Sequence, residues 1–155
     1  MRRIFAAAIL SALALAITAG SSSAQQFGTA AEAKAMEEKA VSELKANPTA
    51  AIAKFNEPSG GFRDRDLYVF CFNAKTGLFD AHVNKALMGT DTRALKEKDG
   101  SPLGQKIFDA ANAAPEGSII TVAYNFPKPG TTNPVPKESF VARVGEHICG
   151  VGYYK

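Results

Sequence analysis

The chain of 155 residues is 46% hydrophobic and 21% charged, which is ordinary for a single globular domain. Its formal net charge of +3 reflects 18 basic and 15 acidic residues, and two of the basic residues, Arg2 and Arg3, lie in an N-terminal segment that we expect to be cleaved. The remaining balance of 16 basic to 15 acidic residues, with no basic run or patch, excludes general electrostatic attraction to nucleic acid or to an anionic membrane.

The N-terminal segment has the composition of a secretory signal peptide. After the two arginines an uncharged apolar stretch runs to Ala19, and small residues follow it up to Ala24. The stretch is shorter than the roughly 20 residues that span a membrane as a helix. We therefore expect a signal peptide at residues 1–24, cleaved rather than kept as an anchor, and a single periplasmic domain at residues 25–155. No second apolar segment of spanning length follows, so we expect no membrane span after cleavage.

Two helical patterns open the exported part. "TAAE" predicts a capping box, in which the Thr29 hydroxyl accepts from a backbone N–H and Glu32 reaches back. Apolar residues then recur every four positions, with charged residues such as Glu37 elsewhere, so this helix is expected to pack on a sheet. The apolar stripe consists of Met36, Ala40 and Leu44. Pro48 interrupts the helix and is well placed to start a second, short helix that runs through Phe55.

The stretch "DLYVFCFN" alternates between two apolar faces and therefore predicts a central strand. One face carries Leu67, Val69 and Cys71, and the other carries Tyr68, Phe70 and Phe72. The next four residues, "AKTG", predict a hairpin turn into a second strand, "LFDAHV", at residues 78–83.

The second half of the chain completes the sheet. A polar, glycine-punctuated segment at residues 85–102 is long enough to predict a wrapped loop with a function. A loop with four prolines, residues 127–137, separates two of the later strands. The later elements are a helix at residues 103–114 and strands at residues 118–126, 138–144 and 147–154. This order predicts an α+β fold of PAS-like architecture, a five-stranded antiparallel sheet with the helices on one side. The long N-terminal helix and the short helix after it are expected to pack on this sheet.

Several ordered motifs resemble a single Cache domain of type 2, an extracytoplasmic sensor domain with a PAS-like fold. They are "FNEPSGGFRDRDLYVFCFNAKTGLFDAH", "LMGTDTRALKEKDGSPLGQKI", "VPKESFVARV" and "GVGYYK", and the resemblance covers residues 29–155. It implies a long N-terminal helix against the sheet, a small-molecule pocket on the opposite face, and a small carboxylate as the ligand. In most similar proteins a membrane helix and a kinase or chemotaxis output follow. None follows here, so we expect a sensor module that depends on a separate membrane receptor or kinase.

The candidate ligand site combines charge with aromatic surface. His82 at the end of the second strand and Lys137 at the start of the fourth can converge over one face, and the resemblance places both at pocket positions. An ammonium and an imidazole donor would hold a small organic anion by charge-assisted hydrogen bonds. Tyr124, Tyr68 and Phe70 would supply the apolar wall and a hydroxyl. The alternatives are that His82 is a structural or surface residue, and that the protein is a periplasmic scaffold or interaction module whose pocket is vestigial.

Catalysis has little support in the sequence. A nucleophilic triad would have to recruit His82 or His147, the only histidines. Asp80 and His82 could both face a metal ion, but no further ligand is spaced to join them. We therefore expect neither an enzyme nor a metal or cofactor.

The last predicted strand, "HICGVGYY", contains Cys149, one of the two cysteines of the chain. Cys71 and Cys149 are the only possible pair, and an even number in an exported protein is compatible with a bridge. If the first and last strands are neighbours, as in a PAS-like sheet, the two lie opposite each other within disulfide range. We favour a structural disulfide, and the alternatives are a redox-responsive bridge or two buried thiols. Gly150 and Gly152 face the other way and should leave room for the rings of Tyr68 and Phe70.

Overall fold

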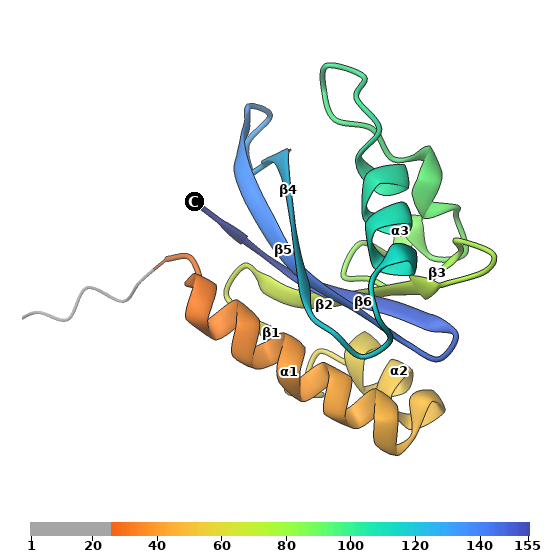
Figure 1. Cartoon of the computed structure of the whole chain (residues 1–155). Coiled ribbons are helices and arrows are strands. Elements are labelled where there is room, and N and C mark those ends of the chain that lie inside the picture. The colour runs from red at the N-terminus through yellow and green to blue at the C-terminus, as the bar shows by residue number, and fades with distance from the viewer. Residues whose placement is uncertain (1–25) are drawn as a thin grey trace, which may run out of the picture.

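An antiparallel sheet with helices on both faces forms the frame of the protein, which the computed structural model describes over residues 26–155 (Figure 1). The predicted signal peptide at residues 1–24 lies outside these residues. The helices are α1 (Ala30–Ala46), α2 (Pro48–Asn56) and α3 (Leu103–Ala113), with short 3₁₀ turns η1 (Lys85–Leu87) and η2 (Thr92–Ala94). The strands are β1 (Arg63–Asp64), β2 (Leu67–Asn73), β3 (Phe79–Ala81), β4 (Ile120–Pro127), β5 (Pro134–Val144) and β6 (His147–Tyr154).

The two N-terminal helices begin where their caps predict. The Thr29 hydroxyl accepts from the Glu32 N–H at 3.2 Å, and the Thr29 N–H donates to the Glu32 carboxylate at 2.8 Å, which completes the capping box. The Asn47 side chain accepts from the Ala50 N–H at 3.0 Å and so caps α2. Both caps satisfy backbone donors that have no partner within the first turn of a helix.

The sheet has the strand order β1-β2-β6-β5-β4, and β3 also pairs with β2. It therefore has six strands rather than the five expected, and the additional strand is the two-residue β1. The hairpin between β4 and β5 is also longer than predicted, because the ladder continues to the pair Pro127 and Pro134. At this end β5 pairs with β4, whereas its pairing with β6 begins only at Lys137. The other edge of β5 is therefore unpaired before Lys137, and a proline there removes no hydrogen bond between strands.

One core lies between the sheet and the first two helices. It contains the predicted β2 face of Leu67, Val69 and Cys71, packed against α1 and α2 residues such as Leu44 and Phe55. The fully buried residues of α1 also include Glu37, which the sequence pattern places off the apolar stripe. The carboxyl group of Glu37 therefore lies inside the molecule.

A second core lies on the opposite face, where α3 covers the other side of β2 (Figure 1). Phe70 and Phe72 pack there with Leu103, Ile107 and Ala111 of α3. The prediction that the helices share one side of the sheet is therefore wrong for α3. Since α1 and α2 already cover one face of the central strands, the apolar side of α3 can only be buried against the other.

The centre of the sheet is cross-linked by a disulfide between Cys71 and Cys149. These residues are directly opposed in the β2–β6 register, with Cα atoms 4.1 Å apart. The predicted disulfide is present, and the alternative of two buried thiols is wrong. Both cysteines have no exposed surface, so the bridge lies within the core beneath α1 and α2.

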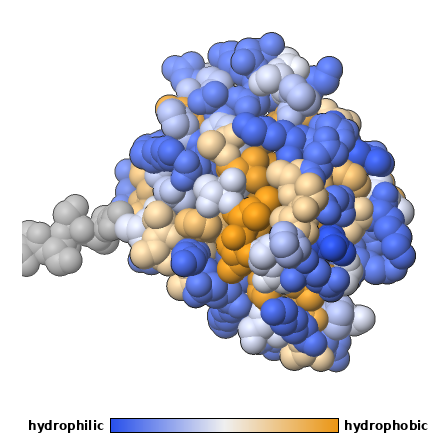
Figure 2. Space-filling model, in the orientation of Figure 1, coloured by the Kyte–Doolittle hydropathy of each residue, from blue (hydrophilic) through white to orange (hydrophobic). Residues whose placement is uncertain are grey.

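The outer surface is mainly hydrophilic. In the view of Figure 2 a hydrophobic strip crosses the middle of the molecule, over the strands between α1 and α3, with hydrophilic side chains around most of it. Among residues 26–155, Leu78 and Phe126 are the large apolar residues with the greatest exposure, at 43% and 38%. Within residues 26–155, each helix is too short or too polar to cross a membrane.

Candidate ligand-binding site

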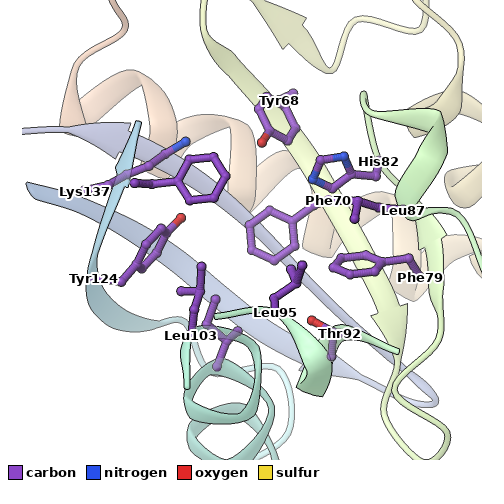
Figure 3. A pocket seen from close by; sticks show the side chains of 12 residues that line it. Tyr68, Phe70, Phe79, His82, Leu87, Thr92, Leu95, Leu103, Tyr124 and Lys137 are labelled. Carbon is purple, nitrogen blue, oxygen red and sulfur yellow. The ribbon is translucent and has the colours of Figure 1, made fainter. Parts of the chain in front are cut away.

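A cavity of about 70 Å³ lies between the sheet, α3 and the segment that precedes α3 (Figure 3). Most of its lining is apolar and comes from Phe70, Phe79, Leu87, Leu95, Leu103, Ile107 and Phe126. Polar atoms are contributed by Tyr68, His82, Thr92, Tyr124 and Lys137. The cavity is thus a small apolar space with a few polar groups, which is the usual composition of a small-molecule site.

The five residues predicted from sequence all line this cavity. Tyr68 and Phe70 extend from β2, Tyr124 from β4 and Lys137 from β5, where Tyr124 and Lys137 are register partners. His82 directly follows β3. Lys137 is inside β5 rather than at its first residue, so its backbone is held by the neighbouring strands β4 and β6.

The Lys137 side chain is only 4% exposed and has aromatic surroundings. Its Nζ lies 4.5 Å from the ring centroid of Tyr154 and 5.5 Å from that of Tyr68. Among residues 26–155, no acid lies within ion-pair distance of this Nζ and no hydrogen bond satisfies it. Burial lowers the pKa of Lys137 to about 8, partly opposed by the charge of Asp66. At neutral pH the group is therefore an ammonium without a direct counter-ion.

His82 presents a neutral ring to the cavity. The Asn84 backbone N–H donates to Nδ1 of His82 at 2.8 Å. Burial, followed by the charge of Lys137, lowers the pKa of His82 to about 4. Because a backbone N–H can only donate, the single proton of the neutral ring must be on Nε2. Figure 3 shows the ring directed toward the space between Tyr68 and Phe70.

Two tyrosine hydroxyls complete the polar groups. The Tyr68 hydroxyl has no hydrogen-bond partner among the described residues, and burial raises the pKa of Tyr68 to about 12. The Tyr124 hydroxyl lies 2.8 Å from Oγ of Ser139, and burial also raises the pKa of Tyr124. Both hydroxyls therefore remain protonated at neutral pH and can donate to a ligand.

Glycines in β6 clear space for this arrangement. A Cβ atom at Gly150 would lie 2.7 Å from the Phe70 ring, as the strand pattern predicts. A Cβ atom at Gly152 would lie 2.6 Å from Cε of Lys137 and 2.7 Å from Oγ of Ser139. At Gly152 the atoms that a Cβ would meet first therefore belong to the lysine and the serine, which the strand pattern did not predict.

The wall residues that come from the loop before α3 are not identifiable from the sequence. Leu87, Thr92 and Leu95 come from the segment 85–102, for which the sequence predicts only a wrapped loop with a function. This segment is tied to the β2–β3 turn, where the Thr92 N–H donates to the Gly77 carbonyl at 2.8 Å. Its apolar residues follow no helix or strand period, so only the length of the loop could indicate a role.

The acidic side chains of the described residues lie outside the cavity lining. No aspartate or glutamate lines the cavity, and no three His, Cys, Asp or Glu side chains of residues 26–155 are grouped to hold a metal ion. Asp80 does not join His82, because its Oδ2 lies 2.8 Å from Nδ1 of His147. A ligand in the cavity would therefore meet one full charge, that of Lys137.

Comparison with known proteins agrees with this architecture. A family model described as Cache domain matches residues 16–155. A methyl-accepting chemotaxis protein from Vibrio parahaemolyticus RIMD 2210633 superposes with a TM-score of 0.62 at 20% identity, covering 80% of this chain and 86% of that chain. A periplasmic sensor domain of a chemotaxis protein gives 0.59 at 24% identity, with coverage of 80% and 88%.

A third structure is a Cache chemosensory domain described for its recognition of carboxylic acid. Its TM-score is 0.57 at 21% identity, with 80% of this chain and 86% of that chain covered. No curated protein sequence matches the chain. At these identities the structural likeness shows the fold, while the family match extends over nearly the whole chain. Cache domains are extracytoplasmic sensory domains that bind small ligands, and this chain belongs to the Cache domain family.

Proposed function

We propose that the protein is a periplasmic, non-catalytic sensor module that binds a small monocarboxylate in the cavity of Figure 3. Lys137 would pair with the carboxylate, His82 and the hydroxyls of Tyr68 and Tyr124 would donate hydrogen bonds, and Phe70 would form the apolar wall. The observation that carries this proposal is the buried ammonium of Lys137, which faces the cavity without a direct counter-ion.

An isolated buried charge is costly unless it is paired and hydrogen-bonded. A bound carboxylate would supply Lys137 with the anion it lacks and would accept charge-assisted hydrogen bonds from the surrounding donors. The site therefore gains most from an anionic ligand.

The size and charge of the cavity restrict the ligand further. One water molecule needs about 10–15 Å³ of such space, so about 70 Å³ corresponds to about five to seven water molecules. This matches a ligand of about four to six non-hydrogen atoms, such as acetate, propionate, lactate or pyruvate. The single cation favours one carboxylate over two, and the absence of a lining acid disfavours amino acids, whose ammonium group would have no partner.

The structural neighbours support this class of ligand and the way its binding is reported. One neighbour recognises carboxylic acid, and two belong to chemotaxis proteins. By this analogy, occupancy of the site would be passed to a membrane receptor or kinase, and the predicted signal peptide would deliver the protein to the periplasm.

Isothermal titration of the purified protein with acetate, propionate, lactate and pyruvate at pH 7 tests the proposal. We expect at least one to bind, and Lys137→Met to weaken binding by about 30-fold or more, since truncating one partner of a buried charge pair costs about 2–5 kcal/mol. The matched control is Lys128→Met, because Lys128 also lies over the Tyr154 ring but does not line the cavity. No binding by any carboxylate, or equal affinity in Lys137→Met, would refute the assignment.

A further inference from the structure

Ser139 is a completely buried polar residue directly behind the cavity. It lies on β5 two positions after Lys137 and therefore on the same face of the sheet. Its Oγ lies 2.8 Å from the Tyr124 hydroxyl, and the structure shows no other partner for this Oγ among residues 26–155. Ser139 does not line the cavity, whereas Tyr124 does.

The surroundings of the two hydroxyls determine which one donates. A buried donor without an acceptor costs about 1–3 kcal/mol. If Tyr124 donated to Ser139, the serine proton would have no acceptor in its enclosed position. If Ser139 donates to Tyr124, both protons can be satisfied, because the tyrosine proton is then free to point into the cavity.

We propose that Ser139 is a positioning residue for ligand recognition, which donates to the Tyr124 oxygen and thereby directs the Tyr124 proton into the cavity. The inference rests on the proposed function and adds a residue that does not touch the ligand. It parallels the effect of the Asn84 N–H on His82, which places the ring proton on Nε2. In both cases a hydrogen bond from outside the cavity leaves a donor facing inward.

As a consequence, the polar groups of the cavity wall favour a ligand that accepts hydrogen bonds. Lys137 can only donate, neutral His82 presents its N–H, and Tyr124 is directed to donate. A carboxylate only accepts and satisfies all three groups. The corresponding primary amide brings its own donors, and an N–H directed at these groups would lack a partner. Ser139 should therefore influence the selectivity between a carboxylate and its amide.

The first test needs no ligand. In proton NMR spectra of the purified protein at low temperature, the Ser139 hydroxyl proton should exchange slowly and show a contact with the Tyr124 ring, while the Tyr124 hydroxyl proton exchanges rapidly with water. The ¹⁵N shifts of His82 should show protonation at Nε2. A protected Tyr124 hydroxyl proton with a rapidly exchanging Ser139 proton would overturn the proposal whether or not a carboxylate binds.

The second test is a double-mutant cycle on the affinities for propionate and propionamide. We expect Ser139→Ala to weaken propionate binding by about 3- to 10-fold, the usual value of one hydrogen bond, and to reduce the ratio of the two affinities. In the Tyr124→Phe background the same change should have no effect, because Ser139 acts through the tyrosine hydroxyl. Ser118→Ala removes an exposed turn hydrogen bond and serves as the control, with no expected change.

The two tests separate this inference from the function on which it rests. An equal loss of propionate affinity from Ser139→Ala in the wild-type and Tyr124→Phe backgrounds would overturn the positioning role while leaving carboxylate binding intact. An unchanged ratio of the propionate and propionamide affinities would do the same. If no carboxylate binds but the NMR pattern is as expected, the proposed function fails and the assigned direction of the Ser139 hydrogen bond is supported.

Discussion

At the scale of the residue, burial of the Lys137 ammonium costs stability, but it places this charge at the wall of the cavity. Its ammonium is removed from water and surrounded by aromatic rings, yet its strand is held on both sides by β4 and β6. A long side chain so confined loses little further conformational entropy when a ligand arrives. In the proposed function this confinement would preorganise the site for an anion, at the expense of the stability of the empty protein.

The affinity for a carboxylate should depend on the protonation of Lys137. The pKa of this group is lowered to about 8 in the empty protein, so the ammonium form predominates at pH 7 and is lost above pH 8. We expect a constant affinity between pH 6 and 7.5 and a decline above pH 8 that approaches tenfold per pH unit. Titration calorimetry from pH 6 to 10 measures this, and an affinity that stays constant to pH 10 would contradict it.

Replacement of Gly152 should disturb the same side chain. In Gly152→Ala the new methyl group would lie 2.6 Å from Cε of Lys137, so the lysine must move. We expect a loss of about 1–3 kcal/mol in the free energy of unfolding, as is usual for overpacking, together with weaker carboxylate binding. Gly28→Ala is the matched control, since it crowds Leu67 in the core beneath α1 rather than a residue that lines the cavity. Equal effects of both variants on affinity would contradict the specific role of Gly152.

At the scale of the element, α1 packs on the sheet through a face that includes a buried acid. Neither carboxyl oxygen of Glu37 accepts a hydrogen bond of normal geometry in the described part of the chain, although the Ala142 backbone N–H lies near the group. Burial raises the pKa of Glu37 to about 8, partly opposed by this N–H, so the side chain is protonated in the folded protein at neutral pH. The helix is held by apolar contacts on either side of Glu37, which compensate for the buried polar group.

This acid should make the stability of the protein depend on pH. The folded protein keeps the Glu37 proton up to about pH 8, whereas the unfolded chain releases it near pH 4.3. The low pKa of His82 makes stability rise with pH up to about 6.5, so the Glu37 proton should make stability fall with pH mainly between about 6.5 and 8. We expect Glu37→Met to remove this dependence and to raise the free energy of unfolding at pH 8 by about 1–3 kcal/mol.

Urea denaturation at pH 6.5 and pH 8, above the range in which His82 titrates, tests the role of Glu37. Glu38→Met is the control, because Glu38 is the neighbouring acid on the same helix and its side chain is 57% exposed. We expect a change close to zero in this control. If Glu37→Met were no more stable than the wild type at pH 8, the buried carboxyl group would not carry the assigned cost.

At the scale of the whole molecule, the two cores share the central strands β2 and β6, and the disulfide joins these strands. The bridge connects positions 78 residues apart, so it restricts the unfolded chain strongly. It lies on the α1 side of the sheet, whereas the cavity lies on the α3 side. Stability and ligand binding are therefore expected to respond differently to its removal.

We expect the double variant Cys71→Ala/Cys149→Ala to lose about 4 kcal/mol of unfolding free energy, from the chain-entropy estimate for a loop of this length. Its carboxylate affinity at 25 °C should change by less than about threefold, because no cavity contact is removed. Guanidinium denaturation and calorimetry measure the two quantities. An unchanged denaturation midpoint would show that the bridge does not constrain the unfolded chain as assumed.

Much of the site can be predicted from particular residues. The alternation from Leu67 to Phe72 is enough to place Tyr68 and Phe70 on one face, because side chains alternate along a strand. The assignment of His82 and Lys137 to one cavity depends on the family resemblance. Thr92 and Leu95 could not be found, since a loop without periodicity gives no indication of which side chains point inward.

The sequence by itself determined the local features of this protein: the capped starts of α1 and α2, the two apolar faces of β2 and the existence of a single cysteine pair. Each depends on residues that are close in the chain or on simple counting. Only the tertiary structure decided which face α3 covers, that Glu37 is enclosed beneath α1, and that Ser139 stands behind Tyr124. These depend on surfaces brought together from distant parts of the chain, where the space left by other elements determines the contacts.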